Sequence, residues 1–271
     1  MPELPEVETT CRGIAPSITD QIVAKVIVRQ PKLRWPIPKN LNTKLKGQII
    51  NSVSRRGKYL LLGSDVGTVI IHLGMSGSLR IIDSKTSPEK HDHVDIVFEN
   101  GKCLRLRDPR RFGAMLFTTG DPYQHKLLAN LGPEPLEHDF NADYLFNKSR
   151  KRSITIKSFI MDSKVVVGVG NIYASESLFK AGIHPKKSAG KVSKEKYKLL
   201  VKAIKAVLKA AIKSGGTTLK DFTKSDGKPG YFKQSLNVYG RKGLPCPACN
   251  KAITHSVIGQ RATYYCTQCQ K

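Results

Sequence analysis

The sequence lacks any long hydrophobic run, any internal repeat and any low-complexity tract. No stretch approaches the ~18 consecutive apolar residues that a membrane-spanning helix requires. The first residues, Met1 to Glu6, are acidic and rich in proline, whereas a signal peptide starts with basic residues and continues with an apolar segment. These absences predict a cytoplasmic protein that is not associated with a membrane.

Acidic residues are also scarce, because Asp and Glu number 21 against 46 Lys and Arg, which gives a formal net charge of +25. A charge this large repels itself, and its usual reason is a polyanionic partner. DNA or RNA, an anionic membrane and an acidic protein all fit that description, and so does a basic surface that serves only solubility. Hydrophobic residues make up 39% of the 271 residues, which is enough for a packed core and for two compact domains.

Cysteine is sparse outside the C-terminal region. Cys11 and Cys103 stand alone in segments with apolar periodicity, which predicts small buried thiols rather than a disulfide or a nucleophile. The other four form two Cys-x2-Cys pairs separated by 16 residues: Cys246, Cys249, Cys266 and Cys269. Two such turns complete a tetrahedron of thiolates, which zinc prefers, although a rubredoxin-like iron site or chance spacing would give the same pattern.

A zinc ion at these cysteines would be structural, because four thiolates leave no open coordination position. The module around them has about 35 residues, too few for a core of its own, so the metal should supply its stability. The module also carries basic side chains, namely Arg241, Lys242, Lys251 and Arg261. It could therefore clamp DNA or serve only as a protein-contact module.

The order of predicted elements indicates two regions of different character. A helix over residues 5–16 precedes β-rich runs at 22–29, 48–54, 58–63, 67–73, 78–82, 94–98, 102–107 and 113–117. Many short strands after one helix favour a β-sandwich or a flattened barrel. Two prolines within residues 131–135 indicate a linker, and beyond it the pattern is helical over 174–180 and 193–213. The Gly- and Thr-rich segment 214–231 is typical of a functional loop.

The N-terminal segment Pro2-Glu3-Leu4-Pro5-Glu6 places carboxylates beside the chain start. Methionine before a small residue is commonly removed, which would leave Pro2 with a free secondary amine. An α-amino group titrates near ~8 and a lysine near ~10.4, so the terminal amine is more often neutral and nucleophilic at neutral pH. Glu3 is adjacent and could act as a general acid. The alternative is an acidic helix start, in which Pro5 opens the helix and Glu6 is favoured by the helix dipole.

Distinctive motifs run from the first residues to the last. They are MPELPEVET at the start, RRGKYLL (55–61), HLGMSGSLR (72–80), KHDHVD (90–95), DPRRFG (108–113), LGPEPL (131–136), VGVGNIYASE (167–176), GGTTLKDF (215–222), VYGRKGLPCPAC (238–249) and QRATYYCTQCQK (260–271). In these motifs the chain resembles bacterial formamidopyrimidine-DNA glycosylase over its whole length.

The resemblance implies an α+β fold with a DNA cleft between two domains. It implies an N-terminal β-sandwich with a leading helix, followed by a helical helix–two-turn–helix domain and a zinc-finger β-hairpin. The boundaries expected from it are 1–132 for the catalytic β-sandwich, 133–236 for the helix–two-turn–helix domain and 237–271 for the zinc finger. A lesion-capping loop is expected at about 217–231.

The resemblance also implies a bifunctional activity in base excision repair. The family flips an oxidised purine, such as 8-oxoguanine or a formamidopyrimidine, out of the duplex, because the reacting C1′ lies inside the base stack. It then breaks the glycosidic bond and nicks the strand by β,δ-elimination. By this resemblance Pro2 is the nucleophile that forms a Schiff base, Glu3 the acid, Lys58 the β-elimination residue and Arg261 the δ-elimination residue. Lys58 follows Arg55 and Arg56, so it could equally be a point charge for phosphate.

The resemblance implies a further set of DNA-contacting side chains. Met75, Arg110 and Phe112 match the residues that fill the space left by the everted base. Stacking lost there is replaced by a thioether and a ring, and the guanidinium hydrogen-bonds the orphaned cytosine. The other expected DNA contacts are His72, His91, Arg152, Lys157 and Asn171.

Two local patterns have competing interpretations that we reject. His91-Asp92-His93 could be a metal-binding pair, but no third ligand is evident in the sequence. Gly168-Val169-Gly170-Asn171 is similar to a dinucleotide fingerprint, but the third glycine is absent and no βαβ pattern surrounds it. It fits better a helix N-terminus at which amides and Asn171 meet a phosphate.

The expected partner is damaged double-stranded DNA, bound by a monomer with one structural zinc ion and no nucleotide cofactor. Two rival hypotheses remain at this stage. The sister enzyme endonuclease VIII, which prefers oxidised pyrimidines, shares Pro2, Glu3 and the zinc finger, although the segment 215–222 favours the purine enzyme. A basic zinc-ribbon protein without enzymatic activity would explain the charge and the cysteines but not the proline–glutamate start.

Overall fold

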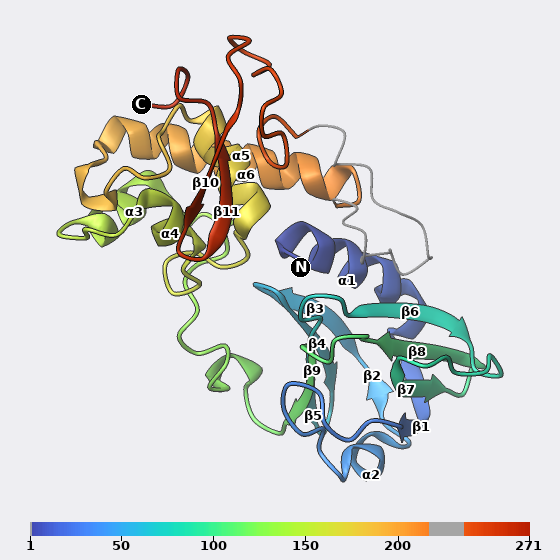
Figure 1. Cartoon of the computed structure of the whole chain (residues 1–271). Coiled ribbons are helices and arrows are strands. Elements are labelled where there is room, and N and C mark those ends of the chain that lie inside the picture. Colours follow the sequence, from blue (N-terminus) through green and yellow to red (C-terminus); the bar gives the residue numbers. More distant parts are fainter. Residues whose placement is uncertain (1, 217–235) are drawn as a thin grey trace. The chain divides into compact units, whose positions relative to one another are not determined.

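The computed structural model describes residues 2–216 and 236–271, which form two compact units (Figure 1). The first unit contains residues 2–130 and the short segment 214–216, and the second contains 131–213 and 236–271. The expected lesion-capping loop at about 217–231 lies outside the described residues. None of the helices in the described ranges is long and apolar enough to cross a membrane.

The first unit opens with helix α1 (Leu4–Ile18), which confirms the predicted helix. Its apolar residues repeat at helical spacing, so one face buries Leu4, Val7 and Ile14. Proline stands in the first turn, where a missing amide hydrogen costs nothing. The helix therefore has a well-defined start, and that start lies two residues from the N-terminal proline.

Two antiparallel sheets follow α1, as the predicted sandwich requires. The strands are β1 (Gln21–Val28), β2 (Ile49–Ile50), β3 (Ser52–Arg56), β4 (Tyr59–Ser64), β5 (Gly67–His72), β6 (Ser78–Asp83), β7 (Asp92–Phe98), β8 (Lys102–Arg107) and β9 (Ala114–Thr118). One sheet has the order β2-β1-β7-β8-β6 and the other the order β3-β4-β5-β9. Each is antiparallel throughout, so every strand can present alternate side chains to a shared core.

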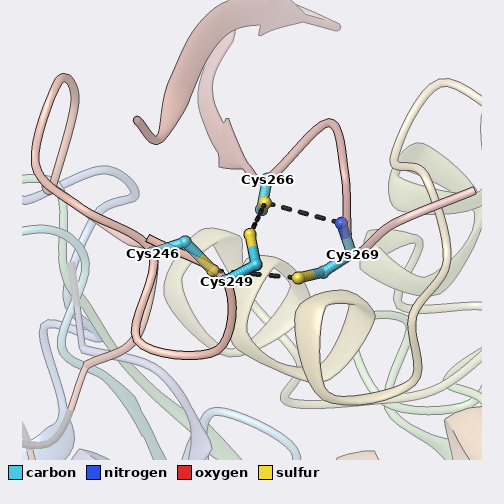
Figure 2. A group of neighbouring side chains, drawn as sticks. All are labelled: Cys246, Cys249, Cys266 and Cys269. Carbon is cyan, nitrogen blue, oxygen red and sulfur yellow. Dashed lines mark hydrogen bonds between the residues drawn. The ribbon is translucent and has the colours of Figure 1, made fainter. Parts of the chain in front are cut away.

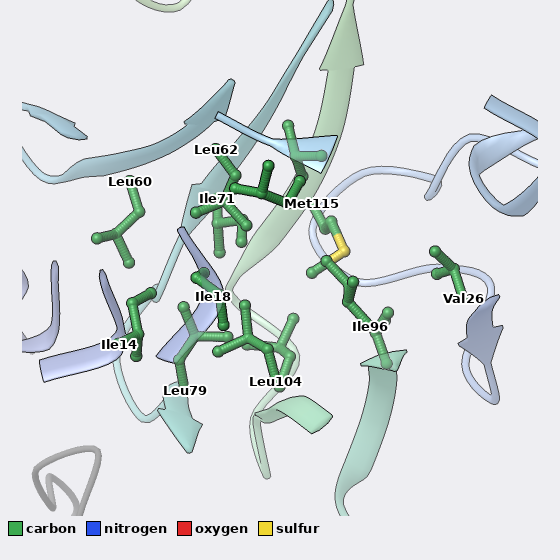
Figure 3. Packing of buried hydrophobic residues seen from close by; sticks show 14 of the residues in the cluster. Ile14, Ile18, Val26, Leu60, Leu62, Ile71, Leu79, Ile96, Leu104 and Met115 are labelled. Carbon is green, nitrogen blue, oxygen red and sulfur yellow. The ribbon is translucent and has the colours of Figure 1, made fainter. Parts of the chain in front are cut away.

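The core of this unit is filled from both sheets and from α1 (Figure 3). Ile14 and Ile18 of the helix pack with Leu60 and Ile71 of one sheet and with Leu104 of the other. All five are at most 1% exposed. Burying a side chain of this size contributes roughly 1.5–3 kcal/mol, so the shared core fixes α1 against both sheets.

The predicted strand 48–54 is in fact two strands. Residues of β2 pair with β1 in the five-stranded sheet, whereas β3 pairs with β4 in the four-stranded sheet. The chain changes sheet at Asn51, whose amide donates to the carbonyl of Gly63 at 2.9 Å. The sequence pattern is continuous because both halves are half-buried, so hydrophobicity alone could not reveal the crossing. The short helices α2 (Leu41–Leu45) and η1 (Pro122–Gln124) were also not predicted.

The second unit is mainly helical, with α3 (Ala142–Ser149), α4 (Ile156–Met161), α5 (Asn171–Lys180), η2 (Ala189–Lys191) and α6 (Lys194–Lys213). The predicted helices 174–180 and 193–213 are confirmed as α5 and α6. Helices α3 and α4 were not predicted from the sequence. They have eight and six residues, too short for a clear periodic signal, and they begin at the capping residues Asn141 and Thr155.

The C-terminal residues form the expected β-hairpin of β10 (Thr254–Ile258) and β11 (Arg261–Tyr265). Only Gly259 and Gln260 connect the strands, and both have positive φ angles, of 53° and 60°. Two positive φ values define the tight turn whose twist matches a hairpin. The turn places Arg261 at the hairpin tip, where its side chain is exposed.

Candidate active site and nucleic-acid interface

The N-terminal residues are held by the first turn of α1. Glu3 is the N-cap, and its amide donates to the Glu6 carboxylate at 2.8 Å, with a reciprocal contact from the Glu3 side chain to the Glu6 amide. Pro2 is buried, and Glu3 is 3% exposed. The structure therefore shows the acidic helix start, and the roles of Pro2 as nucleophile and Glu3 as acid stay predictions.

Gly216 approaches the same place from a distant part of the sequence. A Cβ added at Gly216 would lie 3.1 Å from Oε1 of Glu6, and the residue has a φ of +82°. Both features favour glycine, because an L side chain there would be strained and crowded. The Gly-Gly-Thr motif at 215–217 thus begins in contact with the capping box of α1.

Lys58 lies in the tight turn between β3 and β4, directly after Gly57, whose φ is +58°. The turn is tied to α1 because Arg55 donates to the Glu8 carboxylate at 2.8 Å and to the Gly57 carbonyl at 2.8 Å. Helix α1 also packs on β3 and β4. Lys58 is half-buried and belongs to the same unit as Pro2 and Glu3.

The two segments that carry Met75 and Phe112 touch each other. Gly74 has a φ of +66°, and a Cβ there would lie 2.4 Å from the backbone carbon of Phe112. The close approach requires glycine, because the backbone of Phe112 leaves no room for a side chain. Phe112 is 45% exposed, and the Arg110 guanidinium lies 4.8 Å from its ring centroid. The structure therefore brings the three expected base-replacing side chains, Met75, Arg110 and Phe112, to adjoining loops.

Asp108 fastens these loops and was not recognised from the sequence. Its carboxylate is fully buried and accepts from the Gly113 amide at 2.7 Å and from the Ser76 hydroxyl at 2.9 Å. The Ser76 hydroxyl oxygen in turn accepts from the Arg110 amide at 3.3 Å. A buried carboxylate with this many partners is a positioning group. Its only sequence signal was its place in the motif DPRRFG.

His72 ends β5 beside these loops. Its Nδ1 accepts from the Gly74 amide at 3.0 Å, so the ring proton resides on Nε2. Burial, and then the nearby charges of Lys58 and Arg34, lower the pKa of His72 to about 4. The ring is therefore neutral at physiological pH and can offer Nε2–H as a donor.

His91 and His93 do not form a metal site. His93 Nε2–H donates to the Asp108 carbonyl at 2.8 Å, and the two rings meet edge to face with centroids 6.4 Å apart. Within residues 2–216 and 236–271, the four C-terminal cysteines are the one group of His, Cys, Asp or Glu that could hold a metal ion.

The second unit contains a buried cluster around Lys157. This side chain is fully buried, and its Nζ donates to Asn171 Oδ1 at 2.6 Å, to the Ala262 carbonyl at 3.0 Å and to the Thr263 hydroxyl at 2.7 Å. An ammonium has three hydrogen atoms to donate, and three acceptors inside the protein use them. These three bonds lie within the protein, and direct contact of Lys157 with DNA stays a prediction.

Lys157 holds Asn171 and the backbone of the residue that follows Arg261. Asn171 is the first residue of α5, and its Nδ2 donates to the Ala262 carbonyl at 2.9 Å and to the Tyr239 hydroxyl at 3.4 Å. Lys157 and Asn171 thus both hold the residue that directly follows Arg261. Arg152 lies apart from this cluster, exposed in a turn whose carbonyl accepts from the Gly190 amide at 2.9 Å.

The four cysteines come together at the base of the hairpin (Figure 2). Their sulfur atoms all lie within 4.8 Å of one another, with 3.4 Å between Cys249 and Cys266 and 3.9 Å between Cys246 and Cys269. A zinc ion with four Zn–S bonds of about 2.3 Å requires sulfur–sulfur edges of about 3.8 Å. The geometry fits, and the four thiolates bind one structural zinc ion.

A buried carboxylate attaches this module to the helices. Glu176 of α5 is 2% exposed and accepts from the amides of Asn237, Val238 and Tyr239, each at 2.9 Å. Three amide donors satisfy a buried carboxylate that would otherwise be costly. The zinc module is therefore joined to α5 by Glu176 and to α4 by Lys157.

Cys11 and Cys103 are free and buried, as predicted. Burial raises the pKa of Cys11 to about 11 and the pKa of Cys103 to about 12. A thiol with so high a pKa holds little thiolate, so neither residue is a nucleophile at neutral pH.

A helix-led β-sandwich, a helical unit and an attached zinc hairpin, in a chain with a net charge of +25, define a zinc-finger protein of the DNA-processing class. Three family models match the chain: the formamidopyrimidine-DNA glycosylase N-terminal domain over residues 1–115, the formamidopyrimidine-DNA glycosylase H2TH domain over 131–223 and a zinc finger found in FPG and IleRS over 243–271. The chain belongs to the formamidopyrimidine-DNA glycosylase family.

Relatives and solved structures match this chain over its full length. Formamidopyrimidine-DNA glycosylases of Photobacterium profundum and Syntrophotalea carbinolica are 59% and 57% identical over 271 residues, covering all of both chains. The MutM (Fpg) protein of Thermus thermophilus superposes with a TM-score of 0.89 at 36% identity, covering 99% of this chain and 98% of that one. A Lactococcus lactis Fpg mutant in complex with Fapy-dG-containing DNA gives 0.93 at 33% identity, with full coverage of both.

Proposed function

We propose that this protein is a bifunctional DNA glycosylase and AP lyase of base excision repair, which removes oxidised purines from damaged duplex DNA and then nicks the strand. The observation that carries the proposal is the buried Pro2–Glu3 pair at the capped start of α1. Once Met1 is removed, Pro2 offers a secondary amine with a carboxyl group beside it. An α-amino group has the lowest pKa of the protein's ordinary amines, so it is the natural Schiff-base former.

The chemistry follows from these groups. The Pro2 nitrogen attacks C1′ of the flipped nucleoside as the bond from C1′ to the base breaks, and the proton that the amine loses balances the one that the departing base takes up. Glu3 then supplies a proton to the ring oxygen, the bond from C1′ to that oxygen breaks, and the iminium forms. Lys58 assists β-elimination and Arg261 δ-elimination, which together release both phosphates. Met75, Arg110 and Phe112 occupy the space that the flipped base leaves.

The proposed DNA contacts fall into two kinds. His72, His91, Arg110, Arg152 and the start of α5 at Asn171 contact the DNA directly, mostly through phosphates, which fix position without reading sequence. Lys157 acts indirectly, as a positioning residue behind the groups that contact the DNA. Its three internal hydrogen bonds support the view that it orients Asn171 and the backbone after Arg261.

The protein acts as a monomer without a nucleotide cofactor, and its metal is confined to the zinc module. All the proposed chemistry uses side chains of this one chain. Sedimentation with and without duplex DNA tests the monomer, and full activity in the absence of any nucleotide tests the second point.

Borohydride trapping tests the central proposal. The protein is incubated with duplexes that carry 8-oxoguanine, reduced, and digested for peptide mapping. We expect a covalent adduct on residue 2, which Pro2→Gly weakens strongly because the amine becomes primary and flexible. A crosslink mapped to Lys58 would overturn the proline mechanism.

A parallel duplex with thymine glycol separates purine from pyrimidine specificity. One Lactococcus lactis relative, 33% identical with a TM-score of 0.92, was solved in complex with an oxidised pyrimidine-containing DNA. We expect trapping on 8-oxoguanine to exceed trapping on thymine glycol. The reverse order would assign the protein to the pyrimidine class.

A further inference from the structure

Helix α6 carries a row of lysines that none of the proposed chemistry uses. They are Lys198, Lys202, Lys209 and Lys213, all exposed. At roughly 100° per residue, the four lie within an arc of about 60° on one side of the helix. At about 1.5 Å per residue, the row is about 22 Å long.

The row lies away from the packed face of α6. Residues such as Leu200, Ile204 and Leu208 are fully buried and occupy a separate arc of the helix, and α6 packs against α5 and α3. Asn171, which we propose above as a DNA contact, is the first residue of α5. The four lysines therefore lie on a side of α6 that does not pack against α5.

The four lysines differ from the other lysines of the same helix. Lys194 pairs with the Asp143 carboxylate at 2.6 Å, and Lys205 donates to the Glu137 carbonyl at 2.8 Å. Within the described part of the chain, the four row lysines form no salt bridge. The one acidic residue of α6, Glu195, lies in its first turn, next to the end of the row. Lys198, at one end of the row, also acts on the carboxylates of Asp143 and Glu195, so the single-sign charge of the row lies mainly at Lys202, Lys209 and Lys213.

Charge and shape together select the partner. A strand of duplex DNA presents one phosphate per about 3.4 Å of helix axis, so about six phosphates run beside a row of this length. Lysine is a point charge on a flexible stem, which suits phosphates and reads no sequence. A lipid surface requires an exposed apolar face on the helix, but the apolar face of α6 is buried, and Leu199 is its one exposed large apolar residue.

We propose that Lys198, Lys202, Lys209 and Lys213 form a second contact surface for the backbone of duplex DNA, independent of the lesion. It would hold a second DNA segment, or a distant part of the same DNA, while the lesion site is occupied. This surface goes beyond the proposed function, and it relies on that function only for the choice of DNA as the polyanion.

The test compares two variants of equal charge. The first combines Lys198→Gln, Lys202→Gln, Lys209→Gln and Lys213→Gln, and glutamine keeps the helix because its propensity is close to that of lysine. The control carries the same lysine-to-glutamine change at four exposed lysines of the first unit, namely Lys25, Lys39, Lys46 and Lys85. Excision of 8-oxoguanine from a short duplex should be the same in the wild type and both variants.

Each protein is then trapped on a short lesion duplex with borohydride, so that the lesion site is filled. The trapped complex is titrated with a labelled, undamaged duplex. The wild type and the control should bind it with a salt slope near −3.6, or about 100-fold between 50 and 200 mM salt, whereas the α6 variant should lose that binding. Equal loss in the control, or binding of the wild type to anionic phospholipid vesicles but not to the second duplex, would overturn the proposal.

Failure of trapping itself would count against the proposed function and not against the second surface. In that case the free proteins are titrated with undamaged duplex at low salt. Two duplexes bound per wild-type chain and one per α6 variant would support the surface. A single duplex for both would contradict it.

Discussion

Glu3 caps a helix and is also the residue that we propose as the general acid. It is the N-cap of α1 and nearly fully buried, and the Glu6 side chain fixes its backbone. An exposed capping residue would leave the acid mobile, whereas burial holds it beside Pro2. The acidic helix start that the sequence suggested therefore positions the carboxylate that we propose as the acid.

Glu3→Gln separates these two roles. Glutamine keeps an oxygen that can accept at the helix start but cannot donate the proton, so folding should be preserved. General acid catalysis is typically worth ~100- to ~10,000-fold, and we expect single-turnover excision of 8-oxoguanine to fall by that order. Thermal unfolding is the control for stability. Excision at the wild-type rate would exclude Glu3 as the acid.

His72 gives a prediction in pH. Its folded pKa of about 4 lies below the ordinary value of 6.5, so the unfolded state binds the proton more readily. Stability is therefore fully present above about pH 6.5 and is lost as the pH falls toward 4. From pH 7 to pH 5 this one group should cost about 2 kcal/mol of unfolding free energy.

His72→Asn is the matched variant, because Asn Oδ1 can replace Nδ1 as the acceptor for Gly74. Urea unfolding at both pH values should show a smaller loss for the variant than for the wild type. An equal loss in both proteins would mean that His72 is not the group that titrates.

At the scale of elements, the loops after β5 and β8 act as one piece because Asp108 joins them. Asp108→Ala removes the acceptor of a buried amide and a buried hydroxyl, which costs roughly 1–3 kcal/mol for each unsatisfied group. The positions of Met75, Arg110 and Phe112 should then loosen.

We expect Asp108→Ala to slow excision of 8-oxoguanine more than it slows trapping on a pre-formed abasic site. The abasic substrate has no base to keep flipped out, so it depends less on the residues that replace the base. Asp83→Ala is the control, because Asp83 caps an exposed turn through the Lys85 amide. An equal decrease on both substrates would argue that Asp108 serves only stability.

The zinc module is the second element that permits a test. Its core is small and consists mainly of Val238, Ile253 and two of the cysteines, so folding of this part depends on the metal. Cys249→Ser should release the zinc and weaken DNA binding, because Arg261 is presented by the hairpin. Metal analysis should give one zinc per chain for the wild type and for Cys11→Ala, and none for Cys249→Ser. Retained zinc with full DNA affinity would show that the ligand set is wrong.

At the scale of the whole molecule, the net charge of +25 should dominate affinity for DNA. If lesion binding neutralises about six phosphates, log K should fall with a slope of about −5 against log salt. Fluorescence anisotropy with a short lesion duplex measures this slope. A salt-independent affinity would contradict the electrostatic basis of binding.

Much of the fold could be predicted because it follows from local patterns in the sequence. Alternation and turn residues gave α1, most strands of the sandwich and the two long helices, and all of these are confirmed. The misses have physical causes. The strand 48–54 divides because consecutive residues pair with different sheets, and α3 and α4 are too short for a period to emerge.

The sequence by itself determined the groups that depend on near neighbours. The Cys-x2-Cys pairs form turns of four residues, so spacing alone predicted the zinc ligands, and the helix start beside Pro2 and Glu3 was likewise readable from adjacent residues. The family followed from motifs in the same way.

Only the tertiary structure decided which buried polar side chains meet one another. Lys157 and Thr263 are 106 residues apart, yet their side chains form a buried hydrogen bond of 2.7 Å. Asp108 and Ser76 are separated by 32 residues and fasten two loops that the sequence treats as independent. The reason is that burial and long-range hydrogen bonding arise when distant segments pack, and no local pattern records which side chain a buried donor will meet.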